Sequence, residues 1–463
     1  MEPVDPADMW PEMLVSDDPD VMLSYARDQS QFTAYALPEA VLGPRNTAEV
    51  AAVLHEAARR GLTVAIRGAG TGLSGGANAQ PGSVVLSTHR LNRVVDIDPD
   101  ERIAVVQPGV ITGDLRTQVS RHGLWYPPDP GSVDSCSIGG NVATNAGGMC
   151  CVKYGVTRDF VLGLEVVLAD GSVMRTGRRT AKGVAGYDLT GLLVGSEGTL
   201  GVITEVTVRL VPQPASAATV LATFNTLAAA GSAVRHLTRA RTRLSMLEIM
   251  DRTTLQAVES MRPLGINTDT AAILLIQSDE VDGRAVTAEA ATICHDAGAD
   301  DVIVSDDAQE AELLLQARRL ALPALERLGS WLLDDVCVPR TRIVDLMTHV
   351  ETIAEHEGVL IGVFGHAGDG NMHPTIIYDK DLPDSRAAAQ RAFDQITQRA
   401  LELGGTITGE HGVGRLKRTW LEAELDETAL RTHHALRSSL DPGRLLNPQS
   451  VTSEQVRLGS KMA

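Results

Sequence analysis

The stretch Arg67-Gly-Ala-Gly-Thr-Gly-Leu-Ser-Gly-Gly76, here called loop A, decides the fold, because it directly follows a short apolar strand predicted over 62–66. Glycine lets backbone N–H groups approach a ligand closely, and a run of such groups can bind phosphate. The nicotinamide fingerprint GxGxxG fails, since Leu73 occupies its third glycine position and no acidic residue follows at 87–89. Taken alone, loop A is equally consistent with phosphate binding and with a plain glycine-rich turn.

Two further segments share this composition. Loop B, 129–148, reads DPGSVDSCSIGGNVATNAGG and is predicted to be irregular, and loop C, 195–203, reads GSEGTLGVI. All three loops are rich in backbone donors and poor in side-chain bulk. Together they favour a large, extended, phosphate-bearing ligand, and a dinucleotide fits them better than a single phosphate.

Helix and strand signals alternate around these loops. Asn46 and Glu49 form a capping box, and Gly61 ends the helix that they start. Further strands are predicted over 93–97 and 102–107 (a hairpin), 162–169 and 201–210. Beyond Pro212 and Pro214 the sequence changes to Ala-, Leu- and Arg-rich helical stretches such as 308–322, with apolar strands over 271–276 and 359–364. We therefore place a domain boundary near residue 213.

Composition excludes several classes of protein. The 463 residues carry a net charge of −18, which argues against a nucleic-acid partner. Five cysteines without paired spacing suggest neither a disulfide framework nor an iron–sulfur cluster. The acidic N-terminus does not resemble a signal peptide, and no stretch is apolar enough for a transmembrane segment. We expect a reduced, cytoplasmic protein, and we leave peripheral membrane association open.

Four motifs carry a family resemblance: RGAGTGLSGGA (67–77), PDPGSVDSCSIGGNVATNAGG (128–148), YGVTRD (154–159) and GSEGTLGVITE (195–205). They resemble the FAD-binding half of the vanillyl-alcohol oxidase/p-cresol methylhydroxylase superfamily, and most closely its D-lactate, glycolate and D-2-hydroxyglutarate dehydrogenases. The resemblance implies an α+β protein with a two-subdomain FAD-binding domain (1–213) and a substrate, or cap, domain built on an antiparallel sheet with flanking helices (214–430). A C-terminal segment (431–463) is expected to return to the FAD domain.

By the same resemblance, the FAD-binding residues fall in the glycine-rich loops and at two further places. They are Arg67, Gly68, Ala69, Gly70, Thr71, Gly72, Leu73, Ser74, Pro130, Gly131, Ser135, Gly139, Gly140, Asn141, Asn145, Gly147, Gly148, Tyr154, Gly155, Glu197, Gly198, Gly201, Val202, Ile203 and Asn447. Members that bind flavin covalently through loop A carry histidine in place of Thr71. A threonine hydroxyl is not expected to bond to the flavin methyl carbon, so we expect non-covalent FAD.

The second half contains GHAGDGNMHP (365–374) and TGEHGVGR (408–415). His366, His373 and Glu410 form a His₂Glu set, which would leave coordination positions open on a zinc or manganese ion. From the residues alone, two histidines and a distant glutamate are more often unrelated. The resemblance implies that they bind a divalent metal.

Two further residues receive catalytic roles from the resemblance. His411 is expected to act as the general base, and an imidazole with an ordinary pKa near ~6.5 suits proton abstraction around neutral pH. Arg318, aligned by Pro323, is expected to bind the substrate carboxylate through two N–H bonds. Without the resemblance, His411 could simply be a packed histidine, and Arg318 a solvated arginine on a helix. Asp335 is interpreted as structural.

The expected reaction is oxidation of a (D-)2-hydroxy acid such as lactate or glycolate to the 2-oxo acid, with hydride transfer to flavin N5. An external quinone, electron-transfer flavoprotein or cytochrome would take the electrons, and a homodimer is allowed for. The first alternative is a D-2-hydroxyglutarate dehydrogenase, but members that bind a second carboxylate carry lysine where this chain has Leu333. A second alternative is a non-catalytic flavin- and metal-binding subunit of a glycolate-oxidase-like complex. Relatives that act on sugar lactones or phenols typically lack the two histidine motifs.

Overall fold

The structure is a computed structural model that describes residues 9–180, 182–305 and 307–452. It divides into two compact units. Among the described residues, unit 1 comprises those within 9–146, 156–213 and 410–452, and unit 2 comprises those within 147–155 and 214–409. The change of unit after Gln213 falls where the sequence changes composition.

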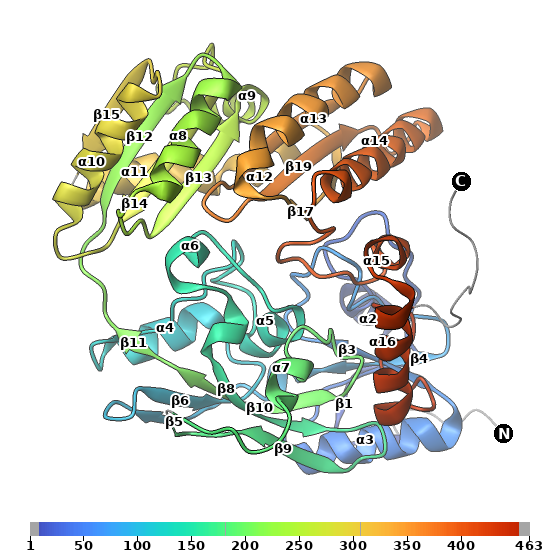
Figure 1. Cartoon of the computed structure of the whole chain (residues 1–463). Coiled ribbons are helices and arrows are strands. Elements are labelled where there is room, and N and C mark those ends of the chain that lie inside the picture. Colours follow the sequence, from blue (N-terminus) through green and yellow to red (C-terminus); the bar gives the residue numbers. More distant parts are fainter. Residues whose placement is uncertain (1–8, 181, 306, 453–463) are drawn as a thin grey trace. The chain divides into compact units, whose positions relative to one another are not determined.

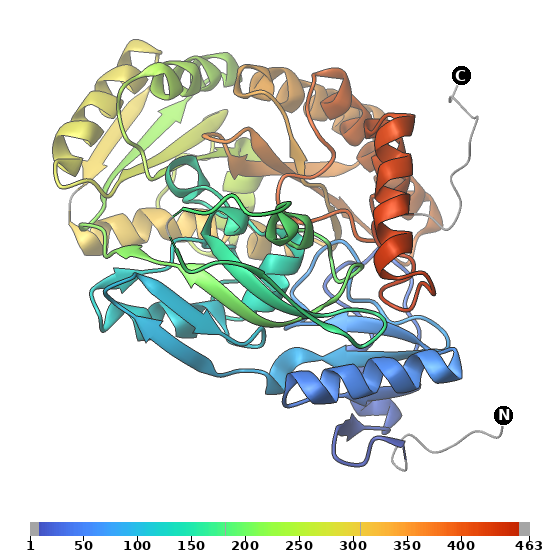
Figure 2. The ribbon, with the colours of Figure 1, turned by 60° about the horizontal axis from the view of Figure 1, so that its bottom comes forward.

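Unit 1 begins with a four-stranded sheet in the order β1-β2-β4-β3, formed by β1 (Leu14–Ser16), β2 (Ala40–Leu42), β4 (Ser83–Ser87) and β3 (Thr63–Arg67). Strands β2, β4 and β3 are parallel. Helix α3 (Thr47–Arg60) covers one face of this sheet (Figure 2). Its start and end are as predicted, since Asn46 accepts a hydrogen bond from Glu49 N and Gly61 takes the left-handed conformation.

The second sheet of unit 1 is antiparallel, in the order β5-β6-β10-β8-β9. Its strands are β5 (Val94–Asp98), β6 (Ile103–Val106), β10 (Val202–Arg209), β8 (Val161–Val167) and β9 (Val173–Gly177). The predicted hairpin is confirmed as β5–β6. The other elements of the unit are α2 (Pro19–Tyr25), η1 (Thr88–Arg90), α4 (Thr112–Ser120), β7 (Leu124–Trp125), α5 (Ile138–Thr144), η2 (Thr157–Phe160), α7 (Leu189–Leu193), β11 (Val211–Pro212), α15 (Arg418–Glu424) and α16 (Glu427–Leu440).

Unit 2 is built on one large antiparallel sheet in the order β15-β12-β14-β13-β18-β19-β16, with β17 also paired to β19. The strands are β15 (Asp301–Ser305), β12 (Ala218–Phe224), β14 (Ala272–Ser278), β13 (Met246–Asp251), β18 (Leu360–His366), β19 (Asn371–Tyr378), β16 (Ser330–Leu333) and β17 (Val336–Cys337). The helices are α6 (Cys151–Tyr154), α8 (Leu227–Arg239), α9 (Arg252–Met261), α10 (Gly283–Asp296), α11 (Ala308–Arg319), α12 (Ala321–Glu326), η3 (Arg340–Arg342), α13 (Ile343–Glu357) and α14 (Pro383–Glu402). Helices α13 and α14 pack against each other over β18 and β19 (Figure 1).

The structure differs from the expectations at three places. Loop B is not irregular throughout, because Ser137 caps a short helix, α5, that ends at Asn145 in the left-handed conformation. The segment 147–155 belongs to unit 2, although its motif resembles the FAD-binding half. The return to unit 1 begins at Glu410 and not at residue 431. Segments 147–155 and 410–430 belong to the units that they contact. Composition alone does not reveal these tertiary contacts.

The C-terminal segment contributes to the core of unit 1. Leu445 and Leu446 are buried in the same apolar cluster as the inner face of α3, and Leu446 forms a parallel bridge with Val64 on β3. Burial of two leucine side chains stabilises such an attachment by roughly 3–6 kcal/mol. In the part of the chain that the structure describes, we find no helix with the length and apolarity needed to cross a membrane.

Candidate functional site

Unit 1 brings the three glycine-rich loops together. A Cβ atom on Gly68 of loop A would lie 2.6 Å from Ser137 Oγ at the start of α5, so loop A and loop B are in close contact. Loop C contacts the other end of α5, where Gly195 N donates to Val142 O at 2.9 Å and Glu197 N donates to Ala143 O at 2.8 Å. Backbone groups of all three loops therefore gather around one short helix.

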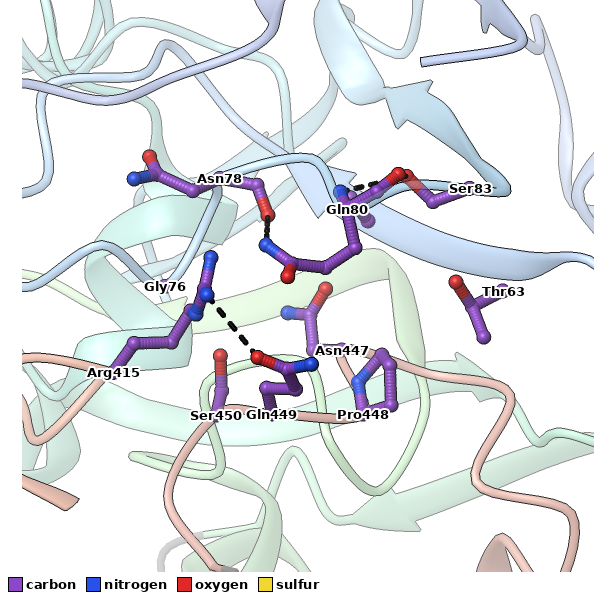
Figure 3. A pocket seen from close by; sticks show the side chains of 11 residues that line it. Thr63, Gly76, Asn78, Gln80, Ser83, Arg415, Asn447, Pro448, Gln449 and Ser450 are labelled. Atoms are coloured by element: carbon purple, nitrogen blue, oxygen red, sulfur yellow. Dashed lines mark hydrogen bonds between the residues drawn. The ribbon is translucent and has the colours of Figure 1, made fainter. Parts of the chain in front are cut away.

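Asn447 ties the C-terminal segment to two of these elements. Its amide oxygen accepts from Ile66 N at 2.9 Å, and its amide nitrogen donates to Glu197 O at 2.8 Å. The same side chain lines a small polar pocket in unit 1, beside Gln449 and Arg415 (Figure 3). The Arg415 guanidinium is already bound to Ala34 O and Gln449 Oε1, so this pocket offers no uncommitted charge to a ligand.

Several predicted FAD-binding residues have visible packing roles. The Arg67 guanidinium donates to the carbonyl groups of Arg27 and Ser24, and it lies under loop A, where a Cβ on Gly70 would meet it at 2.0 Å. Gly70 also has a φ of +77°, which disfavours any other residue. A Cβ on Gly139 would meet Pro108 Cβ at 2.3 Å, so glycine is needed there for packing.

The remaining predicted residues divide between the units. Gly201 packs against Val166 on β8, and Gly140 faces only Ser137 Oγ within 4 Å. Those that unit 1 places in or beside the three loops are Ala69, Thr71, Gly72, Leu73, Ser74, Pro130, Gly131, Ser135, Asn141, Asn145, Gly198, Val202 and Ile203. Those that fall in unit 2 are Gly147, Gly148, Tyr154 and Gly155.

Segment 147–155 is held in unit 2 by charged groups. Lys153 Nζ lies 2.5 Å from Asp279 Oδ1 and 2.8 Å from Glu280 Oε1. The Tyr154 hydroxyl donates to Asp279 Oδ2 at 2.6 Å. Burial and this carboxylate raise the pKa of Tyr154, so the phenol stays protonated. These contacts explain why segment 147–155 belongs to unit 2 and the first part of loop B belongs to unit 1.

Loop 411–416, which carries His411, is held by two predicted FAD-binding residues. The Glu197 carboxylate accepts from Val413 N and Gly414 N, both at 2.8 Å. Ser74 accepts from Arg415 N at 2.9 Å through its carbonyl group, and its hydroxyl donates to His411 O at 3.2 Å. Burial raises the pKa of Glu197 to about 7, although the two backbone bonds oppose that rise. Below this pH the carboxyl group gains a proton and loses part of its acceptor capacity.

His366 and His373 lie on adjacent strands of unit 2. His366 ends β18, and His373 is paired with Phe364 across the β18–β19 ladder. Their ring centroids are 5.1 Å apart with an interplanar angle of 86°. Both side chains are buried. The hairpin between the strands therefore turns a spacing of seven residues into a pair of neighbouring imidazoles.

Glu410, the predicted third metal ligand, directly follows the last residue of unit 2 in the chain. Asp335 holds the end of unit 2 by accepting from Thr408 Oγ1 at 2.7 Å and from Gly409 N at 3.0 Å. Glu410 is joined to Gly409 by one peptide bond. His366, His373 and Glu410 form one group of side chains that could hold a metal ion, and Asp335, His373 and His411 form a second. The oxygens of Asp335 are already occupied by these donors and by Asn371 Nδ2, so the donor chemistry favours the first group.

Glu248 is a residue that the sequence analysis missed. It lies in β13, is 1% exposed, and accepts from His366 Nδ1 through Oε1 at 2.7 Å. Its Oε2 accepts from Arg318 Nε at 2.5 Å. Burial raises the pKa of Glu248, but the nearby His366 and Arg318 outweigh this and hold it below its ordinary value. A glutamate between the apolar residues of the strand MLEIMD is a signal that could have revealed it, because a buried carboxylate needs partners.

Arg318, from α11, is the predicted carboxylate-binding residue. Its guanidinium lies over the Phe364 ring, with Cζ 4.8 Å from the ring centroid. Glu248 occupies only Nε, and the structure, over the residues it describes, gives the two terminal nitrogens of Arg318 no hydrogen-bond partner. The fork of a guanidinium matches the two oxygens of a carboxylate. Arg318 can therefore bind an anion while it remains anchored to Glu248.

Comparisons with known proteins identify the family of this chain. The family profile described as "FAD binding domain" matches residues 38–177, and that described as "FAD linked oxidases, C-terminal domain" matches residues 213–451. The glycolate oxidase subunit GlcD of Bacillus subtilis is 42% identical, over 91% of this chain and 90% of that protein. A D-lactate dehydrogenase of Anaerostipes hadrus is 33% identical, over 92% of each chain. The crystal structure of p-cresol methylhydroxylase shares the fold, with a TM-score of 0.78, 17% identity and coverage of 96% and 94%.

The residues of unit 1 fit an FAD molecule. Loops A, B and C offer backbone donors around α5, and a Cβ atom on Gly131 would meet nothing within 4 Å. Such a surface suits a dinucleotide, whose phosphates are bound by main-chain N–H groups. With both halves of the chain matched, the protein belongs to the FAD-linked oxidase family and is an FAD-binding oxidoreductase.

Proposed function

We propose that this flavoprotein oxidises a short 2-hydroxy acid, of the size of lactate or glycolate, to the 2-oxo acid. The observation that carries the proposal is the pairing of Arg318 and His366 on the two oxygens of Glu248. This pairing supports the proposal because a guanidinium can bind a carboxylate and a neighbouring imidazole can bind a metal. The names of the relatives, glycolate oxidase subunit and D-lactate dehydrogenase, point to the same substrate class.

The protein residues have distinct parts in the proposed reaction. Arg318 binds the substrate carboxylate through its terminal nitrogens, and His411 removes the proton of the hydroxyl group. When bound, a divalent cation held by His366, His373 and Glu410 supplies Lewis-acid stabilisation of the developing alkoxide. When bound, FAD supplies the acceptor for the hydride that leaves Cα. The carbon–oxygen double bond then forms from the electrons of the broken O–H bond.

Substrate size is proposed from Leu333. This residue ends β16, is 5% exposed, and is paired with Thr375, two positions beyond His373 on β19. It offers no cation to a second carboxylate group. We therefore favour a monocarboxylic substrate over 2-hydroxyglutarate. We further propose an external acceptor (a quinone, an electron-transfer flavoprotein or a cytochrome) that reoxidises the flavin.

Anaerobic mixing of the purified chain with single 2-hydroxy acids tests the function. We expect D-lactate or glycolate to bleach the flavin absorbance near 450 nm in a single turnover, since no partner is needed for reduction. The panel includes L-lactate and D-2-hydroxyglutarate. Bleaching by D-2-hydroxyglutarate alone would establish the dicarboxylate alternative. A flavin that no acid reduces would favour a non-catalytic subunit of a larger complex.

The FAD is proposed to be non-covalent, because Thr71 provides no imidazole for a bond to the flavin. Acid precipitation of the purified protein should release all of the yellow colour into the supernatant. The measurement is the absorbance of the supernatant and of the redissolved pellet after washing. Colour that stays with the polypeptide would contradict the proposal for Thr71.

A further inference from the structure

Glu248 holds an unusual position for a carboxylate. Strand β13 lies inside the sheet, between β14 and β18, and its neighbours Leu247 and Ile249 are buried and apolar. Transfer of a charge to such a place is unfavourable unless the charge is paired and hydrogen-bonded. Both oxygens of Glu248 are used, one by His366 and one by Arg318.

The contact to His366 fixes which ring nitrogen can bind a cation. An ionised carboxylate only accepts hydrogen bonds, so Nδ1 of His366 must carry the proton at 2.7 Å from Glu248 Oε1. In the neutral imidazole, Nε2 then keeps its lone pair. Carboxylates that bind the far nitrogen of a histidine in this way orient the ring and raise its basicity as a ligand.

The contact to Arg318 fixes the plane of the guanidinium. Nε is bonded to Glu248 at 2.5 Å, and the group is stacked on Phe364. These two restraints direct the terminal nitrogens of Arg318 without occupying them. Because one rigid carboxylate binds both side chains, the direction of the guanidinium and the direction of the imidazole are set together.

We propose that Glu248 is a positioning residue that sets the tautomer of His366 for metal binding and the orientation of Arg318 for carboxylate binding. The inference rests on the proposed function, which assigns the metal to His366 and the carboxylate to Arg318. Glu248 itself touches neither ligand. It determines the separation at which the hydroxyl and carboxylate groups of one small acid can be bound together.

The test compares zinc binding by the wild-type protein and by Glu248→Gln, with FAD bound and substrate absent. A glutamine has one acceptor and one donor atom, so it cannot accept from both His366 Nδ1 and Arg318 Nε. If its oxygen faces Arg318, its NH₂ group forces the proton of His366 onto Nε2. We expect zinc affinity, measured by equilibrium dialysis against a competing chelator, to fall about 10–100-fold. At saturating zinc, KM for the acid should remain raised.

Two variants control the test. Glu312→Gln removes an exposed carboxylate that pairs with Arg319 on the same helix as Arg318, and it should leave zinc affinity and KM unchanged. Glu248→Asp keeps two acceptor oxygens on a shorter side chain and should retain more zinc affinity than Glu248→Gln, even if the latter unfolds at a lower temperature. The inference would be overturned if Glu248→Gln bound zinc with wild-type affinity, or if Glu248→Asp bound zinc no more tightly than Glu248→Gln. The proposed function would be unaffected by either result. A wild-type protein that binds no zinc would overturn the metal assignment as well.

Discussion

Replacement of His411 by alanine is expected to slow the reduction of the flavin by a 2-hydroxy acid about 10²–10⁴-fold, the usual contribution of a general base. The imidazole is partly accessible, with 18% of its side-chain surface exposed, and its Nε2 lies 3.7 Å from Glu410 Oε1. Its backbone is fixed by Ser74 and the loop that follows by Glu197. In the proposed reaction, a base that is held in this way receives the proton of the substrate hydroxyl group.

The rate should be measured by anaerobic stopped-flow at saturating substrate, so that it reports the chemical step. Zinc content and the flavin spectrum of the variant should match the wild-type values, because the proposed metal ligands and loops A to C are intact. His433→Ala, which removes an exposed histidine on α16, serves as the matched control and should leave the rate unchanged. A His411→Ala variant that reduces its flavin at the wild-type rate would exclude the base role.

Replacement of His373 by asparagine is expected to remove the metal site and to slow flavin reduction about 10³-fold. This magnitude corresponds to the several kcal/mol that a Lewis acid contributes to charge stabilisation. His373 is the informative choice because it belongs to both groups of candidate ligands, with His366 and Glu410 or with Asp335 and His411. The measurements are zinc content after dialysis, the rate of flavin reduction, and the rate after zinc is added back.

His366→Asn separates the two candidate ligand groups. If His366, His373 and Glu410 bind the metal, this variant should lose zinc as His373→Asn does. If this variant keeps zinc at wild-type affinity, the ion is bound by Asp335, His373 and His411 instead. His411 would then be a metal ligand and could not be the general base. His356→Asn, an exposed position on α13 in the same unit, controls for the loss of an imidazole. All three variants should retain FAD, since none of the three histidines is among the predicted FAD-binding residues.

Local signals predicted much of unit 1 correctly. Asn46 and Gly61 mark the ends of α3, because capping depends on hydrogen bonds and backbone angles within a few residues. The hairpin β5–β6 was predicted for the same reason. The same reasoning failed for α5, where Ser137 and Asn145 cap a helix of small residues inside a glycine-rich stretch. Its sequence has no apolar periodicity, and the helix is stabilised by contacts with loops A and C.

The sequence by itself determined the three glycine-rich loops and the two histidine motifs, since these depend on residue type and short spacing. Only the tertiary structure decided the partners of the motif side chains. Glu248 lies 118 positions from His366 and 70 from Arg318, and the three meet because β13 pairs with β18 and α11 packs in the same unit. Strand order in an antiparallel sheet is set by the burial of whole faces, which no local pattern encodes. The same cause assigns segment 147–155 to unit 2 through Asp279, far away in the chain.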